Sequence, residues 1–223
     1  IEGKFASSLL SLIKTKDVNN ISNDDKSFTS LFIAIQYIRS KEKREQLKSM
    51  MEQLKKRLEK ENLADSLKKE LDDATTEKGI KSLHVDLLKE SHRYASIIFN
   101  MKWILIINKT KTPFYTSDNP VALHNSIDQW PYGNLGLACL GIELHIPLTP
   151  WLLLATCDPL AFAHEPSKKV IRDFRYVIRE LNYQVFSSTR FIFSQNTDFS
   201  VARKIIEKNP VAKDPNRKRA TVD

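Results

Sequence analysis

The sequence has few of the residues that usually mark secreted, membrane-spanning or metal-bound proteins. It contains only two cysteines, Cys139 and Cys157, too few for a disulfide framework, and their spacing matches no metal motif. The longest apolar runs, WILII and WLLLA, are strand-sized and far shorter than the ~20 residues of a membrane span. No signal peptide is visible, because Glu2 and Lys4 follow Ile1 directly. We therefore expect a cytoplasmic protein that does not enter a membrane.

Signature motifs of common enzyme and nucleic-acid-binding classes are also missing. The sequence has no P-loop, no Gly-x-Gly-x-x-Gly, no His-Glu-x-x-His and no RNA-recognition or helix-turn-helix signature. A Ser117–His145–Asp triad stays open as an alternative, although no Gly-x-Ser-x-Gly elbow supports it. The motifs alone therefore identify no reaction.

Charge is present in ordinary amount but is unevenly distributed. Charged residues make up 28% and hydrophobic residues 41% of the 223 residues, as in typical globular proteins. The net charge is +8, and the excess lies in two segments, Lys41–Lys60 and Arg203–Asp223. Such segments favour non-specific contact with phosphates, but interleaved glutamates are equally typical of a solvated helix face.

Apolar spacing predicts helices throughout the first 101 residues. A helix is expected over 24–40, and a charged segment follows that is either a long projecting helix or a hairpin broken near Asn62. We expect a loop over 74–79 and one helix over 80–101. His84 falls on the apolar stripe of that helix, which is typical of a core histidine.

The second half predicts a sheet with covering helices. Strands are indicated by KWILIIN, by Phe114–Thr116 and by three further segments: GIELHIPL, WLLLAT and RFIFS. Helices are predicted from near Pro166 to Val185 and over 198–208. We predict one α+β domain over 1–209, whose α-helical half (1–101) packs on a small antiparallel or mixed sheet with covering helices (102–209). Residues 210–223 are expected to form a disordered basic tail.

The order of several motifs resembles an uncharacterised bacterial family, domain of unknown function 4238. The motifs are IEGKFASSLLSLI, FIAIQYIRS, FYTSDNPVAL, IPLTPWLLL and ELNYQVFSSTRFIFS. The resemblance points to Glu2, to Gln36 with Arg39, to the Ser117–Pro120 and Pro147–Pro150 turns, and to Asn182. It also implies a His-rich segment ahead of the first helix, which the printed sequence does not contain, so we expect a fragment or a processed chain that carries only part of any site using those histidines. The resemblance implies no established activity.

The FYTSDNPVAL stretch supplies the main site hypothesis. Asp and Asn followed by Pro are typical of a β-turn, and a turn alone explains the stretch. The alternative uses Arg39, which projects within the apolar stripe of helix 24–40 and must either reach solvent or find an acceptor. If Asp118 is that acceptor, a polar pocket forms between the two halves from Glu2, Gln36, Arg39, Ser117, Asp118 and Asn119.

This pocket gives the first function hypothesis, a hydrolase acting on a phosphate-bearing or other anionic substrate. Asp118 would orient water or a metal ion, Arg39 would clamp the anion, and Asn119 would position it as the third catalytic residue. The substrate-binding residues would be Gln36, Ser117 and Glu2. The alternatives are a purely structural Arg–Asp bridge, or a non-catalytic nucleic-acid-binding or protein-interaction module that uses the basic helix and tail.

A metal site is a weaker alternative. Glu143 and His145 share one strand face and could chelate a divalent metal ion if a third ligand arrived from another strand. The polar face of a half-buried strand explains the same pair. Neither the cofactor nor the oligomeric state follows from these residues.

Overall fold

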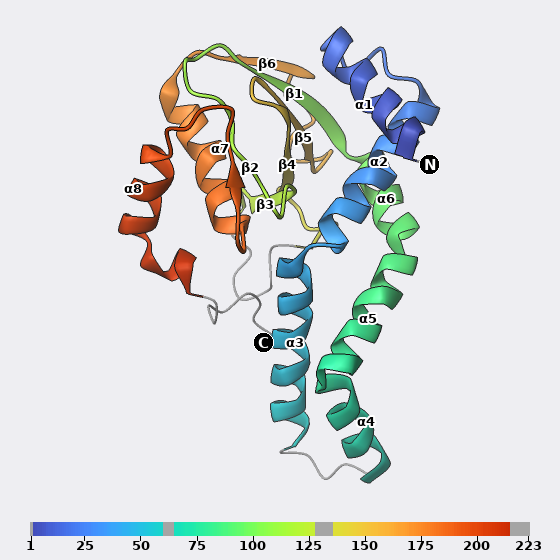
Figure 1. Cartoon of the computed structure of the whole chain (residues 1–223). Helices are drawn as coiled ribbons and strands as arrows, with labels where there is room; N and C mark the ends of the chain where they lie inside the picture. Colours follow the sequence, from blue (N-terminus) through green and yellow to red (C-terminus); the bar gives the residue numbers. More distant parts are fainter. Residues whose placement is uncertain (1, 60–64, 128–135, 215–223) are drawn as a thin grey trace.

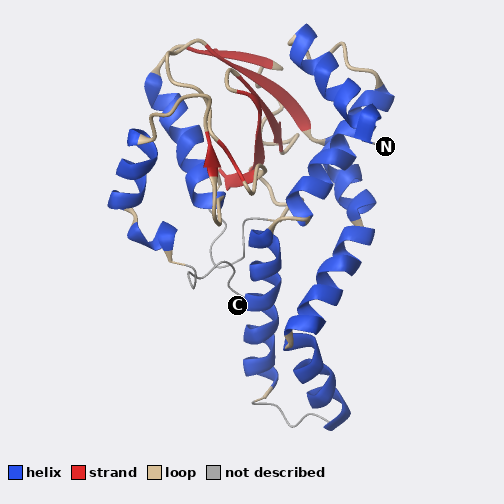
Figure 2. Cartoon of the chain, in the orientation of Figure 1, coloured by secondary structure: helices blue, strands red, loops and turns tan. Residues whose placement is uncertain are grey.

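A computed structural model describes residues 2–59, 65–127 and 136–214. Its first half is helical, and its second half contains a five-stranded mixed sheet and a separate two-stranded sheet. Helices cover both faces of the larger sheet (Figure 2). The predicted α+β class is therefore confirmed.

Six helices are found among the described residues of the first half. They are α1 (Glu2–Thr15), α2 (Asn23–Ile38), α3 (Lys41–Leu58), α4 (Asp65–Thr75), α5 (Glu77–Lys89) and α6 (Ser91–Asn100). Helices α1, α2 and α6 lie against the sheet, whereas α3 and the α4–α5 pair extend away from it as an arm (Figure 1). Side-chain oxygens of Ser22, Ser40 and Thr76 accept from backbone N–H groups and so begin α2, α3 and α5.

The arm corrects two expected boundaries. The loop predicted over 74–79 is reduced to Thr76, because α4 continues to Thr75 and Thr76 caps α5. The single helix predicted over 80–101 is divided at Glu90 into α5 and α6. Of the two alternatives for the charged segment, the hairpin is observed, since α3 packs beside α4 (Figure 1). Its expected break near Asn62 lies outside the described residues.

The larger sheet has the strand order β3-β4-β5-β1-β6. Its strands are β1 (Lys102–Asn108), β3 (Ala122–Asn125), β4 (Ile142–Thr149), β5 (Leu152–Cys157) and β6 (Lys168–Ile171). Strand β1 is antiparallel to β5 and parallel to β6. The smaller sheet pairs β2 (Thr116–Ser117) with β7 (Ile192–Phe193).

The remaining helices are α7 (Phe174–Ser187), α8 (Ser200–Lys208) and the 3₁₀ helix η1 (Pro210–Lys213). The helix predicted from near Pro166 therefore begins later, because Lys168–Ile171 joins the sheet as its edge strand. Pro210–Lys213, expected to be disordered, is helical, and the rest of the predicted tail lies outside the described residues apart from Asp214.

Strand β1 is apolar on both faces because each face supports a different core. Trp103, Leu105 and Ile107 pack in the cluster that contains α2 and α6. Ile104 and Ile106 face the opposite cluster, which contains α7 and α8. The predicted core histidine is also found, since buried His84 places Nε2 2.6 Å from the carbonyl oxygen of Ile38. Within the described residues, no helix combines the length and apolarity that a bilayer crossing requires.

Candidate functional site

The carboxylate of Asp118 binds the segment that follows α7. Its Oδ1 accepts from the backbone N–H of Thr189 at 2.9 Å, and its Oδ2 accepts from that of Arg190 at 2.9 Å. The Thr189 hydroxyl also donates to Oδ2. Three donors from one loop therefore converge on Asp118 and hold that loop against β2.

The neighbours of Asp118 bind the last turns of α7. The buried Ser117 hydroxyl lies 2.8 Å from the carbonyl oxygen of Asn119 and 3.1 Å from Oε1 of Gln184. Asn119 donates through Nδ2 to the carbonyl oxygen of Ser187, and Gln184 donates to that of Pro120. Within the described part of the chain, Asn119 Oδ1 is buried without a hydrogen-bond partner. Only the bond between Ser117 and Asn119 is local to the turn, whereas the others join the turn to the end of α7.

Arg39 lies elsewhere. It is exposed at the end of α2, and its Nε donates to Oε1 of Gln36 at 2.9 Å. Among the described residues Arg39 forms no ion pair with Asp118, so the bridge expected between them is absent. The sheet separates the two residues. Helix α2, at whose end Arg39 lies, packs in the cluster on one face of the sheet, whereas α7, which contacts β2, packs in the cluster on the other face.

Five of the six residues of the predicted pocket are thus divided into two groups. Asp118 and its two neighbours meet α7 and the loop after it, and Gln36 meets Arg39 on α2. Glu2 begins α1, and its side chain lies outside the described residues. The catalytic roles assigned to Asp118, Arg39 and Asn119 stay predictions.

A cluster of buried ionisable groups joins β4 to α7. His145 Nδ1 lies 2.7 Å from Oε2 of Glu180, and its Nε2 lies 3.2 Å from Oε2 of Glu143. Arg179 approaches the other oxygen of Glu180 at 3.4 Å. The Tyr183 ring meets His145 edge-on at 5.1 Å and stacks on His124 at 4.7 Å.

The electrostatics of this cluster favour a charged imidazole. Burial opposes the charge, but the carboxylate of Glu180 and the hydrogen bonds to both glutamates outweigh it and raise the pKa of His145 to about 9. Burial alone would raise the pKa of Glu180, yet the charge of His145 and of Arg179 holds that pKa below its usual range. Two cations and two carboxylates therefore balance, with both ring nitrogens of His145 acting as donors.

The same arrangement argues against the predicted metal site. A ring that donates from both nitrogens has no lone pair for a metal ion. Across the described ranges, no group of three or more His, Cys, Asp or Glu side chains is arranged to hold a metal ion. Burial also raises the pKa of the neighbouring Cys157 thiol, which disfavours the thiolate that binds metals. His145 is instead engaged by Glu180 of α7 and by Glu143 of its own strand.

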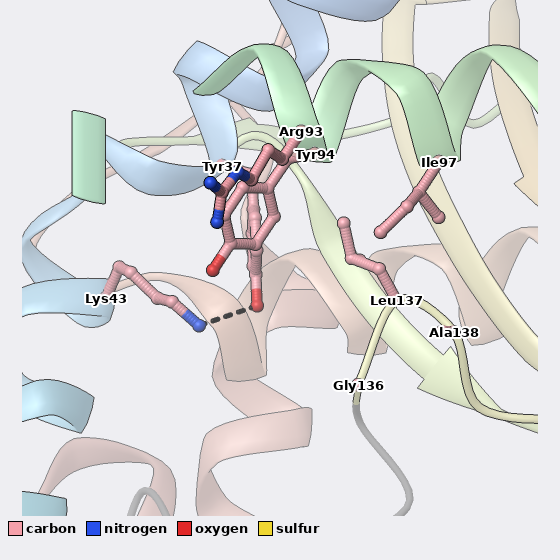
Figure 3. A pocket seen from close by; sticks show the side chains of 8 residues that line it. All are labelled: Tyr37, Lys43, Arg93, Tyr94, Ile97, Gly136, Leu137 and Ala138. Atoms are coloured by element: carbon pink, nitrogen blue, oxygen red, sulfur yellow. Dashed lines mark hydrogen bonds between the residues drawn. The ribbon is translucent and has the colours of Figure 1, made fainter. Parts of the chain in front are cut away.

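A cavity of about 420 Å³ lies where α2, α3 and α6 meet the segment after residue 135. We call it the cation cavity, and it is lined by Tyr37, Lys43, Arg93, Tyr94, Ile97, Gly136, Leu137 and Ala138. Figure 3 shows its polar groups gathered on one side and the side chains of Ile97 and Leu137 on the other. The Lys43 ammonium donates to the Tyr37 hydroxyl at 2.8 Å and lies 4.6 Å from the centre of that ring.

Charge in the cation cavity is not balanced. Lys43 is half-buried, and within the described residues it forms no ion pair with a carboxylate. Arg93 differs, since its Nε lies 2.7 Å from Oε2 of Glu90. The Tyr94 hydroxyl has no hydrogen-bond partner in the described part of the chain. Hydrogen-bond donors therefore remain available to an anion that enters the cavity.

Sequence reasoning named Glu143 and His145 but missed their partner Glu180, and it missed the cation cavity entirely. Glu180 lies on the apolar stripe of α7 with Val177, Leu181 and Gln184, and a carboxylate at such a position needs a buried partner. Lys43 gives no such signal, because it is one of many lysines in α3 and only the packing of α2 against α6 makes it a cavity residue.

Comparison with known proteins agrees with the motif order found above. The family model described as "Protein of unknown function (DUF4238)" matches residues 1–198. No curated protein and no solved structure matches this chain. Since the matched residues cover most of the sequence, the chain belongs to the DUF4238 family.

Proposed function

We propose that this protein binds a small phosphate-bearing or similarly anionic molecule in the cation cavity. The observation that carries the proposal is the Lys43 ammonium, half-buried at the cavity wall and without a described carboxylate partner. Removing a charge from water is costly unless it is paired, so a site of this kind favours a bound anion.

The donors around Lys43 suit several oxygens of one group. The Tyr37 hydroxyl accepts only one of the three N–H bonds that an ammonium offers. The Arg93 guanidinium keeps donors besides the Nε that it directs to Glu90. Together with the Tyr94 hydroxyl, these groups line one side of the cavity (Figure 3). A phosphate oxygen set matches such a cluster of donors.

We limit the proposal to binding. Asp118, the acid that the hydrolase hypothesis needs, is engaged by Thr189 and Arg190. Among the described residues, no hydrogen bond or ion pair joins it to the residues that line the cation cavity. The proposal therefore assigns no catalytic residue.

The nucleic-acid alternative receives less support from the arm. Lys55 of α3 lies 2.6 Å from Asp72 of α4, and it also approaches Glu59. Lys48 pairs with Glu52 along the same helix. Part of the basic surface of α3 is thus balanced within the arm itself, as expected of a solvated face, and binding of nucleic acid by this helix stays a prediction.

Titration calorimetry with inorganic phosphate and with methyl phosphate tests the proposal. Lys43→Met is expected to weaken binding by about tenfold or more, because hydrogen bonds to charged groups are worth about 1.5–3 kcal/mol. Lys48→Met is the matched control, since it removes one lysine from the same helix outside the cavity. The control should bind like the parent chain at equal ionic strength.

Two results would overturn the proposal. One is the absence of binding by the folded parent chain. The other is an equal loss in Lys43→Met and Lys48→Met, which would indicate a response to net charge rather than a site. Thermal unfolding of both variants shows whether a loss of binding reflects a loss of structure.

A further inference from the structure

A second cavity adjoins the first along the outer side of α6. It encloses about 390 Å³, and we call it the apolar cavity. It shares Ile97, Leu137 and Ala138 with the cation cavity, so the two cavities are neighbours, and we call the pair the groove. The change from polar to apolar lining follows α6, with Arg93 toward one end and Asn100 toward the other. At 1.5 Å per residue, these two positions are about 10 Å apart along the helix axis.

The larger polar side chains of the apolar cavity are engaged by the protein itself. Both oxygens of Asp158 accept hydrogen bonds from backbone N–H groups. Oδ1 accepts from Leu160 at 3.0 Å. Oδ2 accepts from Gly141 at 2.8 Å and from Ala161 at 3.4 Å. Asn100 donates to the carbonyl oxygen of Ser96 at 2.8 Å. Both side chains therefore have hydrogen-bond partners within the protein.

Most of the remaining lining of the apolar cavity is apolar. Its wall includes Met101, Pro159 and Leu160 besides the shared Ile97 and Leu137. Leu160 is 79% exposed. A ligand that covers this side chain removes apolar surface from water, which favours binding. The cavity volume is that of a site for a small molecule rather than for a protein surface.

We infer that the ligand of this groove is a free, single-chain amphiphile whose anionic head binds in the cation cavity and whose alkyl chain lies in the apolar cavity. This inference rests on the proposed function, because it places the head at Lys43. The chain crosses Ile97 and Leu137, and the distance along α6 accommodates roughly an octyl chain. Cations at one end and a mainly apolar lining at the other match the two halves of such a molecule.

The affinity of a series of alkyl phosphates measures the contribution of the chain. Methyl, butyl and octyl phosphate are titrated into the full chain as monomers, below the concentration at which octyl phosphate forms micelles. Each fully buried methylene strengthens binding by up to about fourfold. Because the groove is open on one side, we expect affinity to rise by about tenfold or more from butyl to octyl phosphate.

Substitution at the far end of the groove tests the position of the chain. Leu160→Asp should remove most of the gain of octyl phosphate and leave methyl phosphate unchanged, because Leu160 lines only the apolar cavity. Because Leu160 is exposed, we expect the variant to keep its fold, and thermal unfolding verifies this. Val211→Asp is the matched control: Val211 is 66% exposed and lines neither cavity.

The outcomes separate this inference from the proposed function. If methyl and octyl phosphate bind equally and both depend on Lys43, the apolar cavity takes no chain and only the inference is wrong. If neither phosphate binds, the proposed function fails first. If the monomers show no chain dependence but vesicles containing phosphatidic acid bind the protein, the surface recognises a lipid layer, and the inference of a free amphiphile is overturned. Equal losses in Leu160→Asp and Val211→Asp would contradict it as well.

Discussion

The contact of β4 with α7 and the cation cavity between α3 and α6 both contain cations. The buried histidine of the first is paired with carboxylates, whereas Lys43 in the second is not paired with any described carboxylate. At the first, His145 is enclosed between Glu143 and Glu180, and Arg179 balances the second carboxylate. At the second, Lys43 has a tyrosine hydroxyl and no described carboxylate. Buried charges that are fully paired connect structural elements, whereas a half-buried charge without a counterion is open to a ligand. The residue types alone would suggest the reverse, since histidine with two glutamates is typical of catalysis.

Removal of His145 should have the largest effect on stability. In His145→Leu, Glu143 and Glu180 face each other without the cation between them, and loss of one partner from a buried pair typically costs about 3–5 kcal/mol in the free energy of unfolding. Urea denaturation measures this change. His124→Leu is the control, because His124 is only half-buried and stacks on the same Tyr183.

The triple variant sharpens the comparison. Replacing Glu143, His145 and Glu180 together by leucine removes the three enclosed charges and leaves only the half-exposed Arg179 without its carboxylate. Well-packed apolar residues often substitute for a buried ion pair at little cost. We expect this variant to recover much of the stability that His145→Leu loses. A His145→Leu variant as stable as the parent chain would show that the cluster does not hold α7 on the sheet.

The pH dependence of stability should give a smaller effect from the same cluster. The pKa of His145 is raised to about 9 from an unfolded value near 6.5, so its contribution is complete below about pH 6.5 and is lost as pH rises through 9. The loss amounts to about 3 kcal/mol. The pKa of Glu180 is lowered, so its contribution is complete above about pH 4.5 and declines as pH falls below that value.

Unfolding by urea at pH 6 and pH 10 measures the alkaline part of this profile. His145→Leu is the control, since it lacks the group whose proton is lost. A parent chain and a variant that decline equally between the two pH values would contradict the raised pKa of His145.

Sequence patterns predicted the fold better than the site, for reasons visible in particular residues. Periodicity is local, so KWILIIN and GIELHIPL identified β1 and β4, and the alternation in β4 placed Glu143 and His145 on one face. The edge strand β6 was missed because Lys168–Ile171 gains its structure from pairing with β1, which its own residues do not reveal.

The expected site failed where it required a contact between distant elements. Arg39 and Asp118 each have the chemistry of an ion pair, but the sheet lies between the clusters to which α2 and α7 belong. Lys43 became a cavity residue for the same kind of reason, since α2 and α6 meet across more than fifty residues of chain and no local pattern records that packing. The family motifs have the same limit, because their order along the chain identified the family but does not show which motifs meet in space.

The smallest of these effects is expected at the Ser-Asp-Asn-Pro turn. In Asp118→Asn, an amide nitrogen in place of Oδ2 would face the Thr189 hydroxyl and the Arg190 N–H, which are both donors. The negative charge that strengthens all three hydrogen bonds is also lost. We expect the free energy of unfolding to fall by about 2 kcal/mol, and phosphate binding at Lys43 to stay unchanged. Ser126→Ala is a control for the loss of a polar contact outside the turn. Unchanged stability together with weaker phosphate binding would mean that this carboxylate serves a ligand rather than the loop after α7.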